Sequence, residues 1–190
     1  MNQNSTGVAS RLLGLGAIVL MLGLAPVGFA KSAPRAAAKS TPVVVALTDA
    51  EKADLTFMRE EEKVARDAYL YFYGVWGEVI FSNIAKSEQT HMNAIGKLLV
   101  KYGLPDPVAG LGVGQFNTPE FQAMYDELVA LGSASLVDAL SAGVIVEEAD
   151  IADLTFALSE TKVKDITTVY KNLLSGSLKH LASFNAWLAL

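Results

Sequence analysis

From residue 48 onward, hydrophobic residues recur at alternating steps of three and four positions. This spacing places them on one face of an α-helix. No segment alternates polar and hydrophobic residues at every second position, so no β-strand is expected. The pattern predicts four long helices and one short helix, over residues 48–72, 78–102, 119–132, 136–160 and 163–187. The fold is therefore expected to be all-α.

Local signals support these boundaries. Thr48 and Glu51 have the spacing of a capping box, which opens the first helix, and Gly74 is expected to end it. Thr118 and Pro119 are typical of the start of the short helix. Short connections join the first two and the last two long helices, and residues 104–134 join the two pairs. This organisation predicts a ferritin-like four-helix bundle with a crossover connection that contains a short extra helix.

The first 47 residues do not follow the helical pattern. Residues 12–24 form an uncharged apolar run, too short to cross a bilayer comfortably, and Gly28 and Ala30 place small residues where a signal peptidase cuts. Residues 1–30 are therefore predicted to be a signal peptide. Residues 31–47 are predicted to be a flexible linker to a bundle domain over residues 48–190. We expect export to the periplasm or the extracellular space, with no stable membrane anchor after cleavage.

Composition narrows the functional classes. The 190 residues include 20 Asp and Glu against 15 Lys and Arg, a formal net charge of −5, and no cysteine. An acidic chain without a basic stripe is a poor partner for nucleic acid, because binding to phosphate depends on Lys and Arg. The absence of cysteine excludes disulfides and iron–sulfur clusters held by thiolates.

Ionisable residues interrupt the apolar stripe of every long helix. Buried charges are rare without a partner, so four coincident interruptions favour a shared metal ion. A mixed set of carboxylates and imidazoles suits iron, with manganese or zinc as alternatives, as one ion or two. The candidate ligands are Glu62 on the first long helix, Glu88 and His91 on the second, Glu147 and Asp150 on the third, and His180 on the fourth.

The rise of a helix predicts which candidates meet. Glu62 and Glu88 both lie about 20 Å from the turn between their helices, so they are expected to face each other. Glu147 and His180 are expected to differ in height by about 7 Å. Asp150, one turn from Glu147, widens the contact zone without closing that gap.

Simpler interpretations stay open for single residues. An inward histidine is often a hydrogen-bonded core residue, and residues 60–62 (EEE) also fit a solvated face. Glu148 lies one position from Glu147 and is an alternative inward residue. Lys63 lies outside the stripe and is expected to be exposed.

The segment from Glu62 to Tyr69 (EKVARDAY) resembles the first-helix pattern of rubrerythrin-type bundles in the ferritin-like superfamily. Glu88-x-x-His91 is similar to the second-helix motif of that group, and Glu147-x-x-Asp150 is similar to its paired acids. The whole stretch from Leu47 to Phe184 resembles the bacterial ferritin-like family known as domain of unknown function 2202. The resemblance implies a ferritin-like fold with a metal centre and no assigned reaction.

One position departs from the ferritin-like pattern. The fourth long helix carries Ser177-x-x-His180, where the two-metal template has Glu-x-x-His. This departure has three alternative interpretations. Asp150 supplies the missing oxygen ligand, only one metal ion is held firmly, or the site is a structural remnant.

Two functions follow from this set of residues. The first is an exported metalloprotein, a di-iron-type oxidoreductase, for oxidation chemistry on a small substrate such as peroxide, oxygen or ferrous ion. The second is a non-enzymatic module for metal storage or envelope interactions with a degenerate metal site. The expected partners are the metal ion and a small-molecule substrate, and a homodimer is left open.

Overall fold

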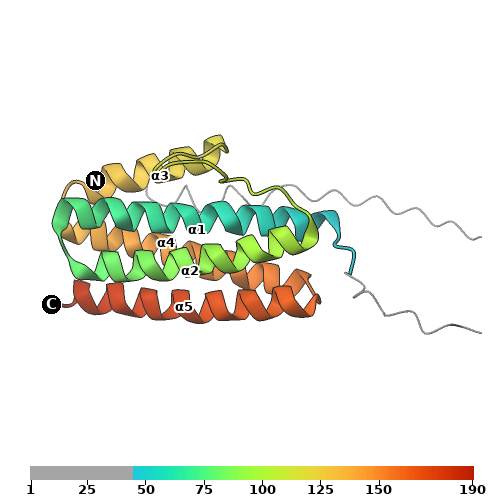
Figure 1. The fold of residues 1–190 in the computed structure, drawn as a ribbon. Helices are drawn as coiled ribbons and strands as arrows, with labels where there is room; N and C mark the ends of the chain where they lie inside the picture. The colour runs from blue at the N-terminus through green and yellow to red at the C-terminus, as the bar shows by residue number, and fades with distance from the viewer. Residues whose placement is uncertain (1–44) are drawn as a thin grey trace, which may run out of the picture. The chain divides into compact units, whose positions relative to one another are not determined.

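A computed structural model of the protein describes residues 45–190, and within them it has five helices and no strand (Figure 1). The helices are α1 (Asp49–Trp76), α2 (Val79–Tyr102), α3 (Pro119–Gly132), α4 (Leu136–Glu160) and α5 (Lys164–Leu188). The all-α prediction is confirmed for this part of the chain. The predicted signal peptide and most of the predicted linker lie outside the described residues.

The predicted start of α1 is confirmed, whereas its predicted end is too early. The Thr48 hydroxyl accepts a hydrogen bond from the Glu51 backbone amide, and the Glu51 carboxylate accepts one from the Thr48 amide, which completes the capping box. The helix continues through Gly74 and ends at Gly77, which has the left-handed φ of 71°. Glycine adopts this conformation at low cost, so Gly77 rather than Gly74 ends the helix.

The four long helices contact one another in a ring. α1 packs on α2, α2 on α5, α5 on α4, and α4 on α1, while α3 lies outside the ring against α1 and α4. Figure 1 shows the long helices side by side, with the crossover and α3 on one flank. This arrangement is compatible with a four-helix bundle that has a crossover connection.

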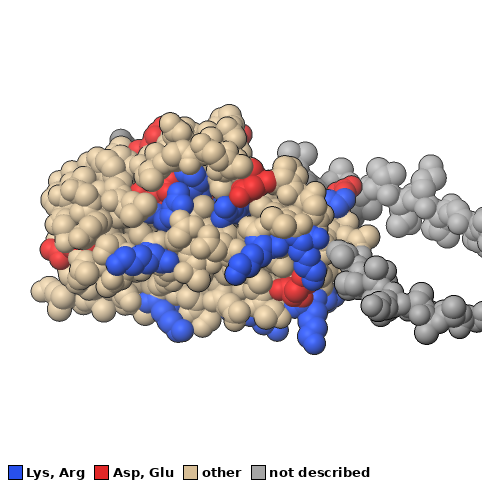
Figure 2. Space-filling model, viewed as in Figure 1, with Lys and Arg blue, Asp and Glu red and all other residues tan. Residues whose placement is uncertain are grey.

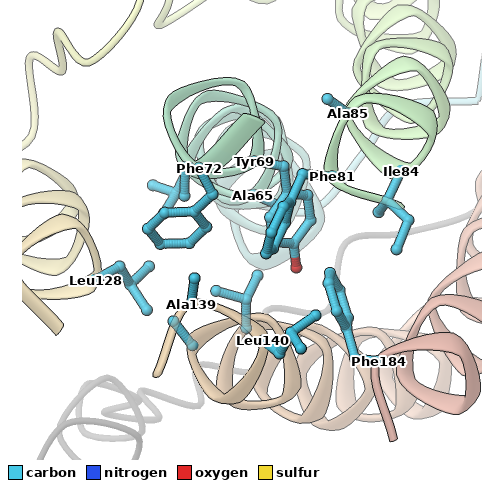
Figure 3. Packing of buried hydrophobic residues seen from close by; sticks show 14 of the residues in the cluster. Ala65, Tyr69, Phe72, Phe81, Ile84, Ala85, Leu128, Ala139, Leu140 and Phe184 are labelled. Atoms are coloured by element: carbon cyan, nitrogen blue, oxygen red, sulfur yellow. The ribbon is translucent and has the colours of Figure 1, made fainter. Parts of the chain in front are cut away.

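Two apolar clusters fill the interior. One includes Phe72, Phe81 and Phe184 near the α1–α2 turn, and Figure 3 shows these rings converging from three helices. The other includes Leu55, Ile95 and Tyr170 at the opposite end. Along every long helix, the candidate ligands fall between the residues of the two clusters. The polar residues therefore form one layer with apolar packing on both sides.

A buried ion pair attaches the crossover to α1. Lys63, expected to be exposed, is only 1% exposed, so that prediction was wrong. Its ammonium contacts the Asp67 carboxylate and donates a hydrogen bond of 2.7 Å to the Gly112 carbonyl, and the Gly114 amide donates to Asp67. The loop and α3 cover this side of α1, which is why a residue outside the apolar stripe becomes buried.

The surface gives little sign of the acidic composition on the face drawn in Figure 2. Lys and Arg side chains are scattered there among uncharged residues, and few acidic atoms are visible. Several of the carboxylates are inside the protein. Among the described helices, none is both long enough and apolar enough to cross a membrane.

Candidate metal centre

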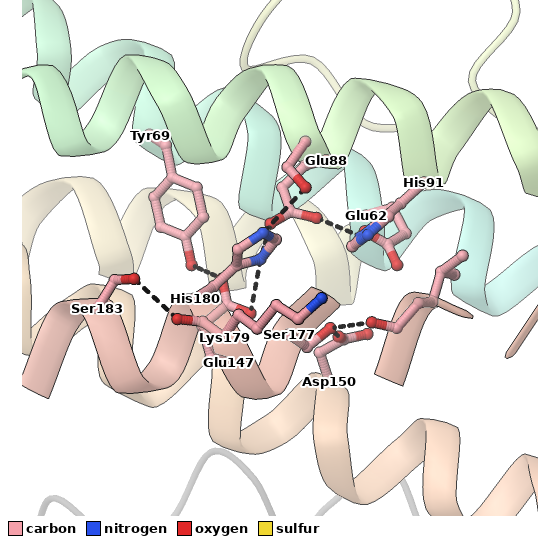
Figure 4. Close-up of polar contacts among 12 residues, drawn as sticks. Glu62, Tyr69, Glu88, His91, Glu147, Asp150, Ser177, Lys179, His180 and Ser183 are labelled. Carbon is pink, nitrogen blue, oxygen red and sulfur yellow. Dashed lines mark hydrogen bonds and ion pairs between the residues drawn. The ribbon is translucent and has the colours of Figure 1, made fainter. Parts of the chain in front are cut away.

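The six candidate ligands lie in the polar layer, and all of them are buried. They come from all four long helices, as Figure 4 shows. Even the most exposed of them, His91 and His180, are only 8% exposed. Burial of this many ionisable groups in one layer is costly unless they neutralise one another or a cation neutralises them.

The first group of ligand atoms joins α1 and α2. His91 Nδ1 lies 2.6 Å from Glu88 Oε2 and 3.2 Å from Glu62 Oε2. The predicted meeting of Glu62 with the Glu88-x-x-His91 motif is therefore confirmed. These three residues converge closely enough to hold a metal ion.

The second group joins α2, α4 and α5. His180 Nδ1 lies 2.7 Å from Glu88 Oε1 and 3.5 Å from Glu147 Oε2. Glu88, Glu147 and His180 also converge closely enough to hold a metal ion. Glu88 belongs to both groups and directs a different carboxylate oxygen into each.

The expected difference in backbone height does not keep the side chains of Glu147 and His180 apart, since His180 Nδ1 lies 3.5 Å from Glu147 Oε2. Cα–Cβ bonds tilt toward the N-terminus of a helix. In α4 this tilt carries the Glu147 side chain away from the α4–α5 turn, and in α5 it carries the His180 side chain toward that turn. Both displacements reduce the gap that backbone heights alone predict.

The choice between adjacent acids is resolved by burial. Glu147 is buried, whereas Glu148 is exposed on the outer side of α4. The interpretation of residues 60–62 as a solvated face was wrong, since all three glutamates are at most 3% exposed. The crossover and α4 cover the flanks of α1 that the apolar stripe alone leaves open.

Several buried atoms of the layer have no hydrogen-bond partner. They are Glu62 Oε1, Glu88 Oε1, Asp150 Oδ1 and His180 Nδ1. His180 Nδ1 and Glu88 Oε1 are 2.7 Å apart, yet their orientation does not form a hydrogen bond. Orphaned nitrogen and oxygen atoms that converge in a buried layer are the donor set of a transition-metal site, so the residues present fit such an ion.

Crowding of the carboxyl groups raises most of their pKa values when no cation is bound. Burial, followed by the charges of Asp150 and Glu88, raises the pKa of Glu62 well above its usual range. Burial also raises the pKa of Asp150 to about 7, although a hydrogen bond from Ser177 opposes the shift. The shifts therefore favour the protonated forms of these acids, and a metal ion would compete with those protons.

The two histidines are shifted in the same direction by their acidic partners. Burial by itself lowers the pKa of His180, but contacts with Glu147 and Glu88 raise it to about 9. Glu88 contacts both imidazoles, and this lowers its pKa to about 2 despite burial. The acidic partners thus favour the charged form of both imidazoles, which opposes the negative charge of the layer.

Ser177 stands where the two-metal template has a glutamate, and its hydroxyl donates a hydrogen bond to Asp150 Oδ2. Asp150 Oδ1 remains without a partner and is buried. Asp150 on α4 therefore lies beside Ser177, the position on α5 where the template glutamate is absent. Asp150 falls outside the two closest groups, so its part as a ligand stays a prediction.

Sequence reasoning missed a residue that orients a ligand. Ser87 Oγ lies 2.9 Å from His180 Nε2, and a proton on Nε2 leaves Nδ1 free to face the carboxylates. Tyr69 on α1 orients a second candidate ligand, because it donates a hydrogen bond of 2.7 Å to Glu147 Oε1. A serine beside a Glu-x-x-His motif was the available signal for Ser87, but its reach to another helix depends on the packing.

Gly176 on α5 leaves the room that His91 occupies. A Cβ atom at this position would lie 2.5 Å from His91 Nε2 and 2.7 Å from His91 Cε1. We expect Gly176→Ala to displace the imidazole and weaken metal binding at the Glu62, Glu88 and His91 group. Metal content after equilibrium dialysis measures this effect.

Gly74→Ala is the matched control, because Gly74 lies within α1 and has no atom within 4 Å of its added Cβ. Alanine is favoured over glycine in a helix by about 1 kcal/mol, so this variant should melt higher and keep its metal content. If Gly176→Ala behaves in the same way, the ring of His91 does not depend on the space beside Gly176.

Comparisons with known proteins place the chain among uncharacterised relatives. It is 49% identical over 138 residues to the uncharacterized protein MJ0754 of Methanocaldococcus jannaschii, covering 73% of this chain and 75% of that protein. A crystal structure of hypothetical protein MJ0754 from Methanococcus jannaschii DSM 2661 superposes with a TM-score of 0.76 at 46% identity, covering 80% of this chain and 86% of that one. Residues 51–189 match the model of the uncharacterized protein domain DUF2202. The chain therefore belongs to the DUF2202 family.

Proposed function

We propose that this protein is an exported, ferritin-like metalloprotein that binds one or two transition-metal ions, iron foremost, and carries out oxidation chemistry in which peroxide, oxygen or ferrous ion is the small substrate. The observation that carries the proposal is Glu88, which lies between two groups of buried ligand atoms and faces a histidine with each oxygen. The ring of four long helices, with an acid or histidine from each, supports the ferritin-like assignment.

Charge supports a centre of two ions. When ionised, Glu62, Glu88, Glu147 and Asp150 carry one negative charge each, and no Lys or Arg of the described residues forms an ion pair with them. Two divalent cations balance four carboxylates and leave the two imidazoles neutral as ligands. Manganese and zinc share this preference for nitrogen and oxygen ligands, so the residues favour a class of metal rather than one element.

The protein residues have definable parts in this chemistry. Bound iron would supply the electron transfer, while Glu62, Glu88, His91, Glu147 and His180 would hold it and Asp150 would add an oxygen ligand. Tyr69 fixes Glu147, and Ser87 fixes the ring of His180. The apolar clusters on both sides of the layer exclude bulk water, which strengthens the electrostatic interactions there.

The test is oxidation of bound iron. The mature protein is loaded with ferrous ion under argon, and peroxide or oxygen is then added while near-ultraviolet absorption reports ferric ion. We expect faster oxidation than for the same amount of ferrous ion with the His91→Ala and His180→Ala double variant. Failure of the parent protein to take up iron, manganese or zinc would refute the proposal.

A storage or buffering module gives a different result in the same experiment. The absence of an acid at Ser177 is the feature that favours it, because a two-metal oxidase usually has a carboxylate there. Such a module would bind iron at equilibrium without faster oxidation, and that outcome would replace the enzymatic proposal.

A further inference from the structure

A second set of acids lies beside the candidate ligands, between α1 and α4. Glu61 is 3% exposed, and its Oε2 atom has no hydrogen-bond partner. Its carboxyl group meets that of Asp153, which is half-buried and so reaches toward solvent. Neither residue has a part in the centre described above.

The pairing of α1 with α4 explains this contact. Tyr69 bonds to Glu147, and Thr161 near the end of α4 bonds to Glu51 near the start of α1, so the two helices are antiparallel. Glu61 lies eight residues before Tyr69, and Asp153 lies six residues after Glu147, which places both at nearly the same height. Asp150 lies one turn before Asp153 on α4, and Glu62 is the residue after Glu61 on α1.

Two carboxyl groups in contact require a proton or a cation between them. Glu61 is buried, and the carboxyl groups of Asp150, Asp153 and Glu62 lie close enough for their charges to act on it. Among the described residues no Lys or Arg forms an ion pair with Glu61, Asp150 or Asp153. Oxygens without a hydrogen-bond donor occur on Glu61 (Oε2) and on its two neighbours Asp150 (Oδ1) and Glu62 (Oε1).

We propose that Glu61 and Asp153 form a transit site for divalent cations, which passes them from solvent to the centre through Asp150. The observation that points to a ligand is the Oε2 atom of Glu61, which has no hydrogen-bond partner and belongs to a side chain more than nine-tenths buried. Carboxylate oxygens bind divalent cations and release them readily when few other ligands are present. A line of like charges with low-dielectric walls also raises the local concentration of cations. The inference rests on the proposed function, since it needs a metal centre to supply.

The experiment follows loading of the full-length mature protein with Co²⁺, because this ion absorbs visible light when nitrogen and oxygen atoms bind it. Stopped-flow absorbance gives the loading rate, and elemental analysis after gel filtration gives the final cobalt content. Glu61→Gln and Asp153→Asn should each slow loading by about tenfold and leave the final content unchanged. Glu148→Gln removes an exposed acid of the same helix and should load like the parent.

Each alternative result has a distinct meaning. Parent-like loading rates in both variants would overturn the transit site while leaving the metal centre intact. A lower final cobalt content would make Glu61 or Asp153 a ligand of the centre and overturn its transit role. No cobalt binding by the parent would overturn the proposed function itself. Asp153 is half-buried, so Asp153→Asn should fold even if a change at Glu61 disturbs the core, and thermal melting checks both variants.

Discussion

Replacing Glu88 with Gln should abolish metal binding at both groups of ligand atoms. Each carboxylate oxygen of Glu88 faces one histidine, His91 at 2.6 Å and His180 at 2.7 Å, so one substitution removes a charged ligand from both places. An amide of the same shape keeps the packing but offers one weak oxygen ligand and no charge. We expect metal affinity to fall by more than about 100-fold, since even indirect partners of a ligand contribute 10- to 100-fold.

The histidine variants provide the comparison. His91→Ala removes a ligand of the group with Glu62 alone, and His180→Ala removes a ligand of the group with Glu147 alone. Each should lose part of the metal content that Glu88→Gln loses entirely, as measured by elemental analysis after dialysis. Glu148→Gln on the outer face of α4 should retain the parent content. Equal retention by Glu88→Gln would show that this residue does not bridge the two groups.

The free energy of unfolding of the metal-free protein should fall as pH rises from about 4 to about 9. The pKa of Asp150 is raised from 3.8 to about 7, so the folded state holds its proton more tightly than the unfolded chain does. That stabilisation is complete below pH 3.8 and is lost as pH rises through 7. The pKa of His180 is raised from 6.5 to about 9, and its contribution is lost as pH rises through 9. Each proton of difference changes the free energy of unfolding by about 1.4 kcal/mol per pH unit.

Metal should reverse this trend, because cations compete with protons for the same atoms. The stability difference between metal-loaded and metal-free protein should therefore increase with pH. Urea unfolding in matched buffers measures it as a free energy, and thermal unfolding measures it as a melting temperature. Glu88 has a pKa lowered to about 2 and stabilises the fold throughout this range. Asp150→Asn is the control, since it should flatten the slope of the metal-free protein between pH 4 and 7. A stability that stays constant or rises with pH would show that the buried acids are not protonated.

The helices and the candidate ligands could be predicted from the amino-acid sequence alone. Helix boundaries depend on local signals, such as the capping box at Thr48, and on a repeat of hydrophobic positions that is set by helical geometry. The inward placement of Glu88 and His91 follows from the same repeat, since residues three apart share a helix face. The meeting of Glu62 with Glu88 was also predictable, because a short turn fixes the relative height of two antiparallel helices.

Most contacts between side chains of different helices, by contrast, could not be predicted without the packing of the helices. The contact of Glu147 with His180 depends on opposite side-chain tilts in antiparallel helices, and the space for His91 depends on a glycine of α5. Burial of Lys63 and of Glu61 depends on the crossover and on α4, which cover flanks of α1 that its own pattern marks as polar. These features arise from segments far apart in sequence, and a periodic pattern in one helix carries no information about what packs on its other faces.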